Sequence, residues 1–329
     1  MSEKRKEHRD RLVVLGFVSV LLVLIYGPLA PWFVSADRFL YDTFASNLRA
    51  NTLDDSVIVS IDPARKSRDE IFAEYGRLLQ SFQKQGVERV IMAEPPAMEV
   101  TDELPGWAAM LSGATPIFVP ANHRLADVSN RTGAFVLEPD TDQVLRKSRL
   151  WYLQGGSMLP SLALAVALSS QDYSADLRVS AADIEIYLSS YVAVERLSPG
   201  QVLDPNFSTN GLTGKTVFLD SSPELISAIA ILPSGQFVTA SEITAQLLAD
   251  IELGQSIISP SWVRAMEWLA PALLAIMAAL LLPARNRRDI VHLTTITILT
   301  VILVEALFLL IGQLRLDLGR AVIVFPVSY

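Results

Sequence analysis

Acidic and hydroxyl side chains follow several short runs of aliphatic and β-branched residues in this sequence. The runs cover residues 57–61, 87–92 and 217–219, and the polar residues after them are Asp62, Glu94, Asp220 and Ser221. If the runs are parallel β-strands, these side chains lie at the carboxyl ends of the strands, where open α/β sheets bind ligands. Carboxylates held there could do acid–base chemistry, contact a ligand, or accept hydrogen bonds from a helix N-terminus. We favour ligand contact over catalysis and take all four as candidate binding residues.

A second charged group stands in the middle of the chain, where Asp140 and Asp142 precede Arg146. The two aspartates suggest a calcium loop, but an EF-hand needs Gly at its sixth position and Glu at its twelfth. Leu145 and Trp151 occupy those positions, which excludes that loop. We expect an Asx-type turn in which Arg146 pairs with a carboxylate. Asp140, Asp142 and Arg146 also remain candidate ligand contacts.

The composition excludes several classes of site. The chain has no cysteine and three histidines, of which only His123 falls in its central part. Thiolate metal sites, cysteine nucleophiles and histidine-based triads or zinc clusters are therefore not expected. Residues 35–261 carry 16 Lys and Arg against 28 Asp and Glu, and an acidic domain disfavours nucleic acid. We expect no metal, no cofactor, no nucleic-acid partner and no enzyme activity in this chain.

A first hydrophobic segment long enough to cross a membrane precedes the central part. Residues 12–34 run for 23 positions without a charge, behind a basic tail at residues 1–11. Positive charge before the span predicts a cytoplasmic N-terminus. A cleaved signal peptide is the alternative, because Val34, Ser35 and Ala36 resemble a cleavage site, but the apolar core is longer than such peptides have. The mean hydropathy of +0.36 fits a folded domain combined with a few spans.

Two further predicted spans follow the central part. They cover residues 262–282 and 290–311 and are joined by a basic loop at residues 283–289, which predicts a cytoplasmic position for that loop. Residues 312–329 then form an outer loop and the start of a possible further span. This pattern predicts a multi-pass protein of the inner, cytoplasmic membrane, with the lipid bilayer as its first partner and its large domain on the periplasmic or extracellular side.

Three charged residues lie within or beside these later spans. Glu305 interrupts an apolar run, where a charge is costly, so we expect it either to face protein or to reach water about two turns from the helix end. Arg264 and Glu267 are three residues apart and can pair at the membrane interface. All three are candidate contacts with a partner.

The region between the spans, residues 35–261, alternates β-rich runs with amphipathic helical patterns joined by short connections. This alternation predicts an α/β domain with a central, mostly parallel or mixed sheet flanked by helices, beside an α-helical transmembrane part. Runs 133–138 and 145–153 are expected as strands and a possible hairpin. The expected helices cover residues 35–50, 69–85, 104–111, 161–168 and 241–251.

Several local patterns, in this order, resemble the second type of CHASE domain, an extracytoplasmic sensory module of bacterial signalling proteins. Its middle motif is the most specific part: a Gly before a strand, Asp-x-Asp-Gly with a following Arg, then Pro-Ser-Leu-Ala. The matching residues are Asp37, Tyr41 and Asp42 at the start, Ile61 and Asp62, then Gly133, Asp140, Asp142, Arg146 and Pro160 to Ala163, and later Gly214, Lys215 and Val217. The chain departs from the pattern at Glu94 for Asp, at Gln143 for Gly and at Thr244 for His.

The resemblance implies a sensory input module, closed by three spans that lead to a cytoplasmic output domain outside this sequence. An unknown small ligand or a partner would bind the domain, and the transmembrane helices would pass the signal on. The alternative is a non-catalytic membrane scaffold or accessory subunit whose periplasmic domain docks onto a partner protein. A homo-oligomer or a membrane partner protein is expected in either case.

Overall fold

A computed structural model describes most of the chain. The described residues are 30–45, 51–63, 66–96, 104–169, 185–188, 192–204, 211–221, 229–253, 257–259, 261–281 and 287–310, with isolated positions 16, 20, 27, 207 and 315. Most of the predicted first span, the loop at 283–289 and the segment 312–329 lie outside these residues. The chain divides into two compact units, Leu48–Ser256 and a second unit of Met1–Asn47 with Ile257–Tyr329.

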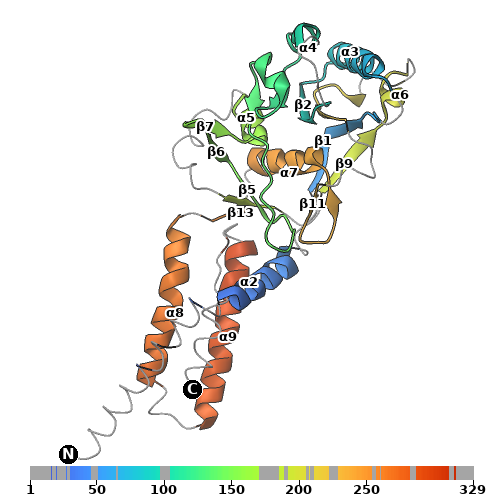
Figure 1. Cartoon of the computed structure of the whole chain (residues 1–329). Coiled ribbons are helices and arrows are strands. Elements are labelled where there is room, and N and C mark those ends of the chain that lie inside the picture. Colours follow the sequence, from blue (N-terminus) through green and yellow to red (C-terminus); the bar gives the residue numbers. More distant parts are fainter. Residues whose placement is uncertain are drawn as a thin grey trace, which may run out of the picture. The chain divides into compact units, whose positions relative to one another are not determined.

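The larger unit is built on a six-stranded sheet in the order β4-β3-β2-β10-β1-β9 (Figure 1). Every neighbouring pair in it is parallel, which confirms the predicted parallel α/β sheet. Strand β10 enters late in the chain and lies between β1 and β2. The strands are β1 Asn51–Ser60, β2 Arg89–Glu94, β3 Ile117–Pro120, β4 Thr132–Gly133, β9 Val192–Leu197 and β10 Thr216–Asp220.

One face of this sheet is covered by α3 Arg68–Lys84, α4 Leu104–Leu111 and α6 Pro199–Val202, with the 3₁₀ turn η2 Arg124–Asp127. Alternate strand residues such as Val57, Val90 and Val217 join these elements in one buried core, as the two-residue period of a strand requires. Helix α3 begins with a capping box between Ser67 and Glu70, which satisfies backbone donors at its first turn.

The opposite face is covered by α5 Leu162–Ser169 and α7 Ala240–Glu252, which contact each other and the strands. Two ion pairs fix α7 at its ends: Arg196 of β9 lies 2.8 Å from Glu242, and Arg89 of β2 lies 2.6 Å from Glu252. The face turned to α7 therefore combines an apolar layer with charged contacts at both ends of the helix.

Short antiparallel pairs complete the larger unit. β5 Lys147–Arg149 pairs with β8 Glu185–Tyr187, β6 Trp151–Gln154 with β7 Ser157–Pro160, and β11 Ala230–Ile231 with β12 Phe237–Val238. The possible hairpin between 133–138 and 145–153 is therefore not the pairing that forms. Gly133 and Ala134 bond to β3 and to the backbone of Pro160 and Leu162 instead.

The second unit contains α2 Ala30–Ala45, β13 Ile257–Ile258, α8 Ser261–Leu281 and α9 Arg287–Leu310. Helix α2 runs through the predicted boundary at residue 34. Pro31 does not interrupt the helix, because it stands in the first turn, where proline is tolerated. Val263 of α8 packs against Val301 and Val304 of α9. Among the described residues one stretch, Arg288–Leu309, is long and apolar enough to cross a membrane, and the apolar stretch Ala265–Leu274 of α8 is shorter.

Candidate functional site

Three of the predicted strand ends lie side by side at the carboxyl edge of the sheet. Asp220, the last residue of β10, is in register with Ser60 of β1 on one side and Glu94 of β2 on the other. Asp62 follows β1 after one residue, and Ser221 follows β10 directly. The order β2-β10-β1 thus places Glu94, Asp220 with Ser221, and Asp62 on adjacent strands. The sequence could predict the strand ends, and the insertion of β10 makes them neighbours.

Hydrogen bonds tie these strand ends together. Ser221 donates twice to the carbonyl oxygen of Glu94, from its backbone nitrogen at 3.3 Å and from its Oγ at 2.7 Å. The backbone nitrogen of Ile61 donates to the carbonyl of Asp220 at 2.7 Å. The backbone at this edge is therefore fixed, and the side chains project from a rigid base.

Helix α3 adds residues to this edge that sequence reasoning missed. Tyr75 is fully buried, its ring packs edge-on against Trp107 at 5.3 Å between centroids, and its hydroxyl lies beside Ser221. Glu74 is buried next to it and forms an ion pair with Lys66. The helical spacing placed Tyr75 on the apolar face of α3, but nothing local indicates where a hydroxyl at the end of a buried ring will point.

We call the residues Asp62, Glu74, Tyr75, Glu94, Asp220 and Ser221 the strand-end cluster. Asp62 is exposed, Glu94 and Ser221 are half-buried, and Asp220 is only 1% exposed. Burial raises the pKa of the Tyr75 hydroxyl far above its ordinary value, and the nearby charges of Asp220, Glu74 and Glu94 raise it further, while Ser221 lowers it. Tyr75 is therefore a neutral hydroxyl at any physiological pH, set among carboxylates.

The end of β3 lies next to that of β2 and carries the one histidine of the larger unit. His123 accepts a hydrogen bond at Nδ1 from the backbone of Leu125, 3.2 Å away, and so begins η2. Burial lowers the pKa of His123, and the backbone of Pro96 partly offsets this. The imidazole is thus neutral near pH 7 and acts as a helix cap.

The second predicted group forms a cluster of its own, which we call the Arg146 turn. Arg146 is 3% exposed and donates from Nη1 to Asp140 and Asp142, both at 2.9 Å, and from Nη2 to Asp142 at 2.8 Å. Asp142 also accepts from the backbone of Val144 at 3.2 Å. This is the Asx-type turn paired with an arginine that the sequence predicts. Its contacts are with the Leu188 and Ile231 backbones, away from the strand-end cluster.

Within the part of the chain that the structure describes, no three His, Asp or Glu side chains are grouped so that they could hold a metal ion. The hydroxyl of Ser221 is already committed as a donor to a carbonyl. The carboxylates of the strand-end cluster can accept hydrogen bonds, and its hydroxyl groups can donate or accept them.

A family model for the CHASE2 domain matches residues 15–284. This chain belongs to the CHASE2 family. CHASE2 domains are extracytoplasmic sensory domains of signalling proteins, so the chain carries such a domain. No curated protein and no solved structure matches it significantly.

The most specific CHASE2 motif of this chain serves the fold. A Cβ added at Gly133 would lie 2.5 Å from the Cα of Leu162 and 3.0 Å from the carbonyl oxygen of Ser161, so the segment needs glycine there. The backbones of Ala134 and Leu162 bond across the same contact, and Ser161 Oγ accepts from the Leu164 nitrogen to begin α5. Gly133 and the Pro-Ser-Leu-Ala segment therefore contact each other, and this close backbone contact requires the glycine.

Two departures from the CHASE2 pattern have visible consequences. Gln143 stands where the pattern has Gly and adopts a left-handed φ of +66°, a conformation that suits glycine best. Thr244 stands where the pattern has His; it is buried and donates to the Ala240 carbonyl at 2.7 Å. The cavity beside Thr244, which Tyr152 and Ser161 also line, measures about 10 Å³, enough for about one water molecule.

The structure describes some of the charged residues that were predicted to lie in or beside the membrane spans of this CHASE2 protein. Glu305 of α9 is only 6% exposed, which favours the first of the two expectations, that it faces protein, over the second, that it reaches water. Its contact with a partner stays a prediction. Glu267 is half-buried on α8, and the side chain of Arg264 lies outside the described residues, so their pairing stays a prediction. A residue that sequence reasoning missed is Arg315, whose guanidinium lies 4.4 Å above the ring of Tyr41.

Proposed function

We propose that this CHASE2 protein is a membrane-anchored input module that binds a small ligand at the strand-end cluster. The observation that carries the proposal is the convergence of Asp62, Glu94 and Ser221 at three adjacent strand ends. The position matches the place where open parallel sheets bind ligands. Carboxylates at the surface favour a ligand that is cationic or donates hydrogen bonds. We propose that the chain is not itself an enzyme and that the output lies in another domain or in a partner.

The transmembrane helices would pass the signal on, and Arg315 supports a route. Its guanidinium packs on Tyr41 of α2, the helix that precedes the sheet in the chain. Its backbone nitrogen donates to the carbonyl of Ile258 in β13, at 3.1 Å, just after the domain ends. One buried arginine thus joins the segments through which the chain enters and leaves the sensory domain. A change in their spacing would act directly on this contact.

The proposed topology is a multi-pass protein of the inner membrane with a cytoplasmic N-terminus. It is supported by the basic segments at residues 1–11 and 283–289 and by the family's extracytoplasmic domain. Because the chain has no cysteine, single cysteines report cleanly on sidedness. An impermeant maleimide added to spheroplasts should label Asp69→Cys and spare Asn286→Cys until the membrane is opened. Labelling of Asn286→Cys in intact spheroplasts would disprove the topology.

Ligand binding is tested by hydrogen exchange on the full chain in nanodiscs. The probe is the fraction below 1 kDa of a bacterial periplasmic extract, compared with buffer. We expect slower exchange at residues 58–63, 92–96 and 218–221, and loss of this protection in the Asp62→Asn, Glu94→Gln double variant. Asp69→Asn, an exposed change on α3, is the control that keeps the protection. Equal exchange with and without the extract, or protection that survives in the double variant, would refute the assignment.

A scaffold function is the second candidate, and the β6–β7 hairpin favours it. Leu153 is 75% exposed and Met158 46% exposed, and the two face each other across the hairpin. Paired apolar side chains at an exposed tip are typical of a docking contact. A photo-crosslinking residue at Leu153 should capture a defined partner or a second copy if this function holds. Crosslinks to lipid or solvent alone would remove it.

A further inference from the structure

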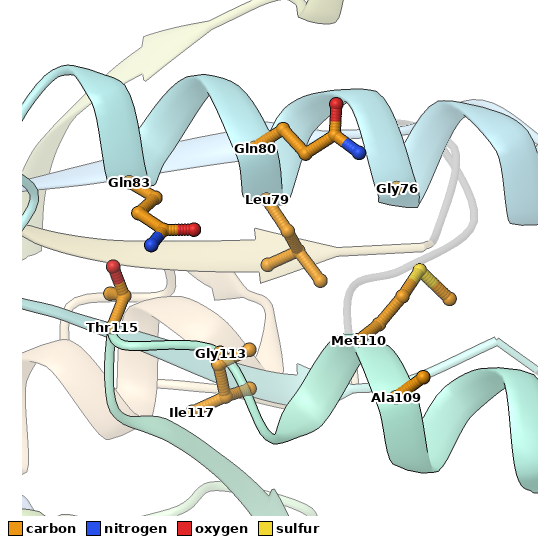
Figure 2. A pocket seen from close by; sticks show the side chains of 9 residues that line it. All are labelled: Gly76, Leu79, Gln80, Gln83, Ala109, Met110, Gly113, Thr115 and Ile117. Carbon is orange, nitrogen blue, oxygen red and sulfur yellow. The ribbon is translucent and has the colours of Figure 1, made fainter.

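A groove of about 260 Å³ lies between α3, α4 and the start of β3, away from the strand ends (Figure 2). Figure 2 shows Leu79 directed from α3 and Met110 from α4 into the space between the helices. Leu79 and Ile117 are buried and form the apolar side of the groove.

Three small residues, Gly76, Ala109 and Gly113, line the groove, and Gly76 has no packing reason to be small. Gly106 does not line the groove; a Cβ added there would lie 2.8 Å from the ring of Phe72, so that glycine lets the two helices approach. A Cβ added at Gly76 would meet only the sulfur of Met110, at 3.4 Å, which is ordinary contact. Glycine in the middle of a helix is unfavourable relative to alanine. Gly76 therefore preserves space that the fold itself does not require.

The polar groups at the rim set the chemistry. Gln80, Gln83 and Thr115 line the groove together with the apolar residues, and Figure 2 shows Gln83 directed toward Thr115. None of the lining residues in the described part of the chain is charged. Within the same part, the amide groups of Gln80 and Gln83 make no hydrogen bond to another side chain or to the backbone. Each amide offers both a donor and an acceptor to a ligand.

We propose that this groove binds a small uncharged molecule with one apolar side and one amide or hydroxyl group. The apolar side packs on Leu79, Met110 and Ile117, and the polar group bonds Gln83 and Thr115 at the rim. A charged ligand is disfavoured, because the groove offers no opposite charge to replace the water that the ligand loses. This site goes beyond the proposed function, and it stands whether or not the strand-end cluster binds anything.

Methyl NMR on the full chain in nanodiscs tests the proposal, because Met110 is one of seven methionines. The probe is N-acetyl-leucinamide, neutral with an apolar side chain and two amides, and the control is N-acetyl-leucine, which has the same size and is an anion at pH 7. The Met110 methyl signal, assigned by its loss in Met110→Leu, should shift saturably with the neutral probe. Met92 and Met158 should not shift. The anion should bind about tenfold more weakly or not at all.

Variants separate the groove from the rest of the molecule. Gly76→Leu fills the space with a good helix former and should abolish the Met110 shift, whereas Ala73→Leu, exposed on the same helix, should keep it. Gln83→Leu should weaken binding about fivefold, the loss expected for one hydrogen bond. The Asp62→Asn, Glu94→Gln double variant should bind the probe normally, so failure of either site can be told apart. No saturable shift, equal binding of the anion, or binding by Gly76→Leu would each overturn the proposal.

Discussion

The Arg146 turn and the strand-end cluster contain the same kinds of residue but hold their charges in different ways. In the turn, one buried arginine makes three hydrogen bonds to two aspartates that stand four and six residues before it. In the cluster, burial raises the pKa of Tyr75, and the carboxylates of two strands, Asp220 and Glu94, and of helix α3, Glu74, raise it further. A counter-charge a few residues away lets a group neutralise itself locally.

The two groups also differ in role: the residues of the family motif support the fold, whereas the strand-end residues are proposed to bind a ligand. The Gly133, Asp-x-Asp, Arg146 and Pro-Ser-Leu-Ala segments, on which the sequence resemblance mainly rests, all make contacts inside the fold. Motif specificity here reflects backbone geometry that few residues satisfy. The strand-end residues are commoner types, and they carry the proposed binding.

The largest effect is expected when the cation of the Arg146 turn is removed. Arg146→Ala leaves Asp140 and Asp142 facing each other beside a buried space, so we expect the free energy of unfolding to fall by about 3 kcal/mol. Arg149→Ala is the matched control, because its pair with Glu138 is about half exposed on both sides and should be worth less than about 1 kcal/mol. Urea unfolding of the full chain in detergent, followed by tryptophan fluorescence, measures both. Similar losses for the two variants would mean that the turn is no more than a surface ion pair.

Gly133→Ala tests whether the family glycine is structural. The added methyl would meet backbone atoms of Leu162 and Ser161, which cannot rotate away, so we expect a loss of about 2–3 kcal/mol from overpacking. Gly113→Ala is the control, since its Cβ would meet only the Met110 carbonyl at 3.5 Å, and it should change stability by less than about 0.5 kcal/mol. Equal effects in the same unfolding measurement would remove the packing argument.

Asp250 of α7 shows what burial does to the pKa of a carboxyl. Burial raises the pKa of Asp250 to about 7, and a hydrogen bond from Gln246 only partly opposes this. The folded pKa lies above the unfolded value, so the folded state binds the extra proton. The stabilising contribution of protonated Asp250 is therefore fully present below about pH 4 and is lost as the pH rises to about 7.

Asp250→Asn should remove that pH dependence. At pH 8 we expect the variant to be more stable by about 2 kcal/mol, below the limit of about 4 kcal/mol that a shift from 3.8 to about 7 sets. At pH 4 the two proteins should unfold at nearly the same temperature, because Asp250 is then protonated in the folded state and the pH is close to the ordinary pKa of 3.8 that applies to the unfolded state. Thermal unfolding at both pH values measures this, with Asp69→Asn, an exposed carboxyl, as the control. A stabilisation that is the same at pH 4 and pH 8 would show that proton binding is not its cause.

Much of the fold follows from local pattern. Helix α4 has the predicted bounds, β2 and β10 lie within two residues of the predicted runs 87–92 and 217–219, and Gly86 ends α3 with a left-handed φ. Strand β1 begins six residues before the predicted run 57–61, and β7 and β9 were not predicted. The pairing of Arg146 with Asp140 and Asp142 was also predictable, because turn chemistry acts over a few residues. These features depend on neighbours in the sequence.

The rest depends on neighbours in space. The position of β10 between β1 and β2 follows from how the whole sheet buries its two faces, and no run of residues encodes it. The involvement of Tyr75 and Glu74 follows from that order, because α3 packs over the strands whose ends it meets. The hairpin expected at 133–153 failed for the same reason. Gly133 pairs with β3, and the two parts of the run 145–153, β5 and β6, pair with β8 and β7.

The smallest expected effect concerns Gln143, where the chain departs from the family glycine inside the Arg146 turn. A φ of +66° costs a residue with a side chain about 1 kcal/mol or more, and glycine avoids that cost. Glycine also makes the unfolded chain more flexible, which offsets part of the gain in stability. We therefore expect Gln143→Gly to raise the free energy of unfolding by about 0.5–1 kcal/mol. Gln80→Gly in the middle of α3 should lower it by about 1 kcal/mol. If Gln143→Gly were destabilising, the glutamine side chain would be contributing to the turn. The Arg146 turn would then depend on more than its backbone shape and its three charged side chains.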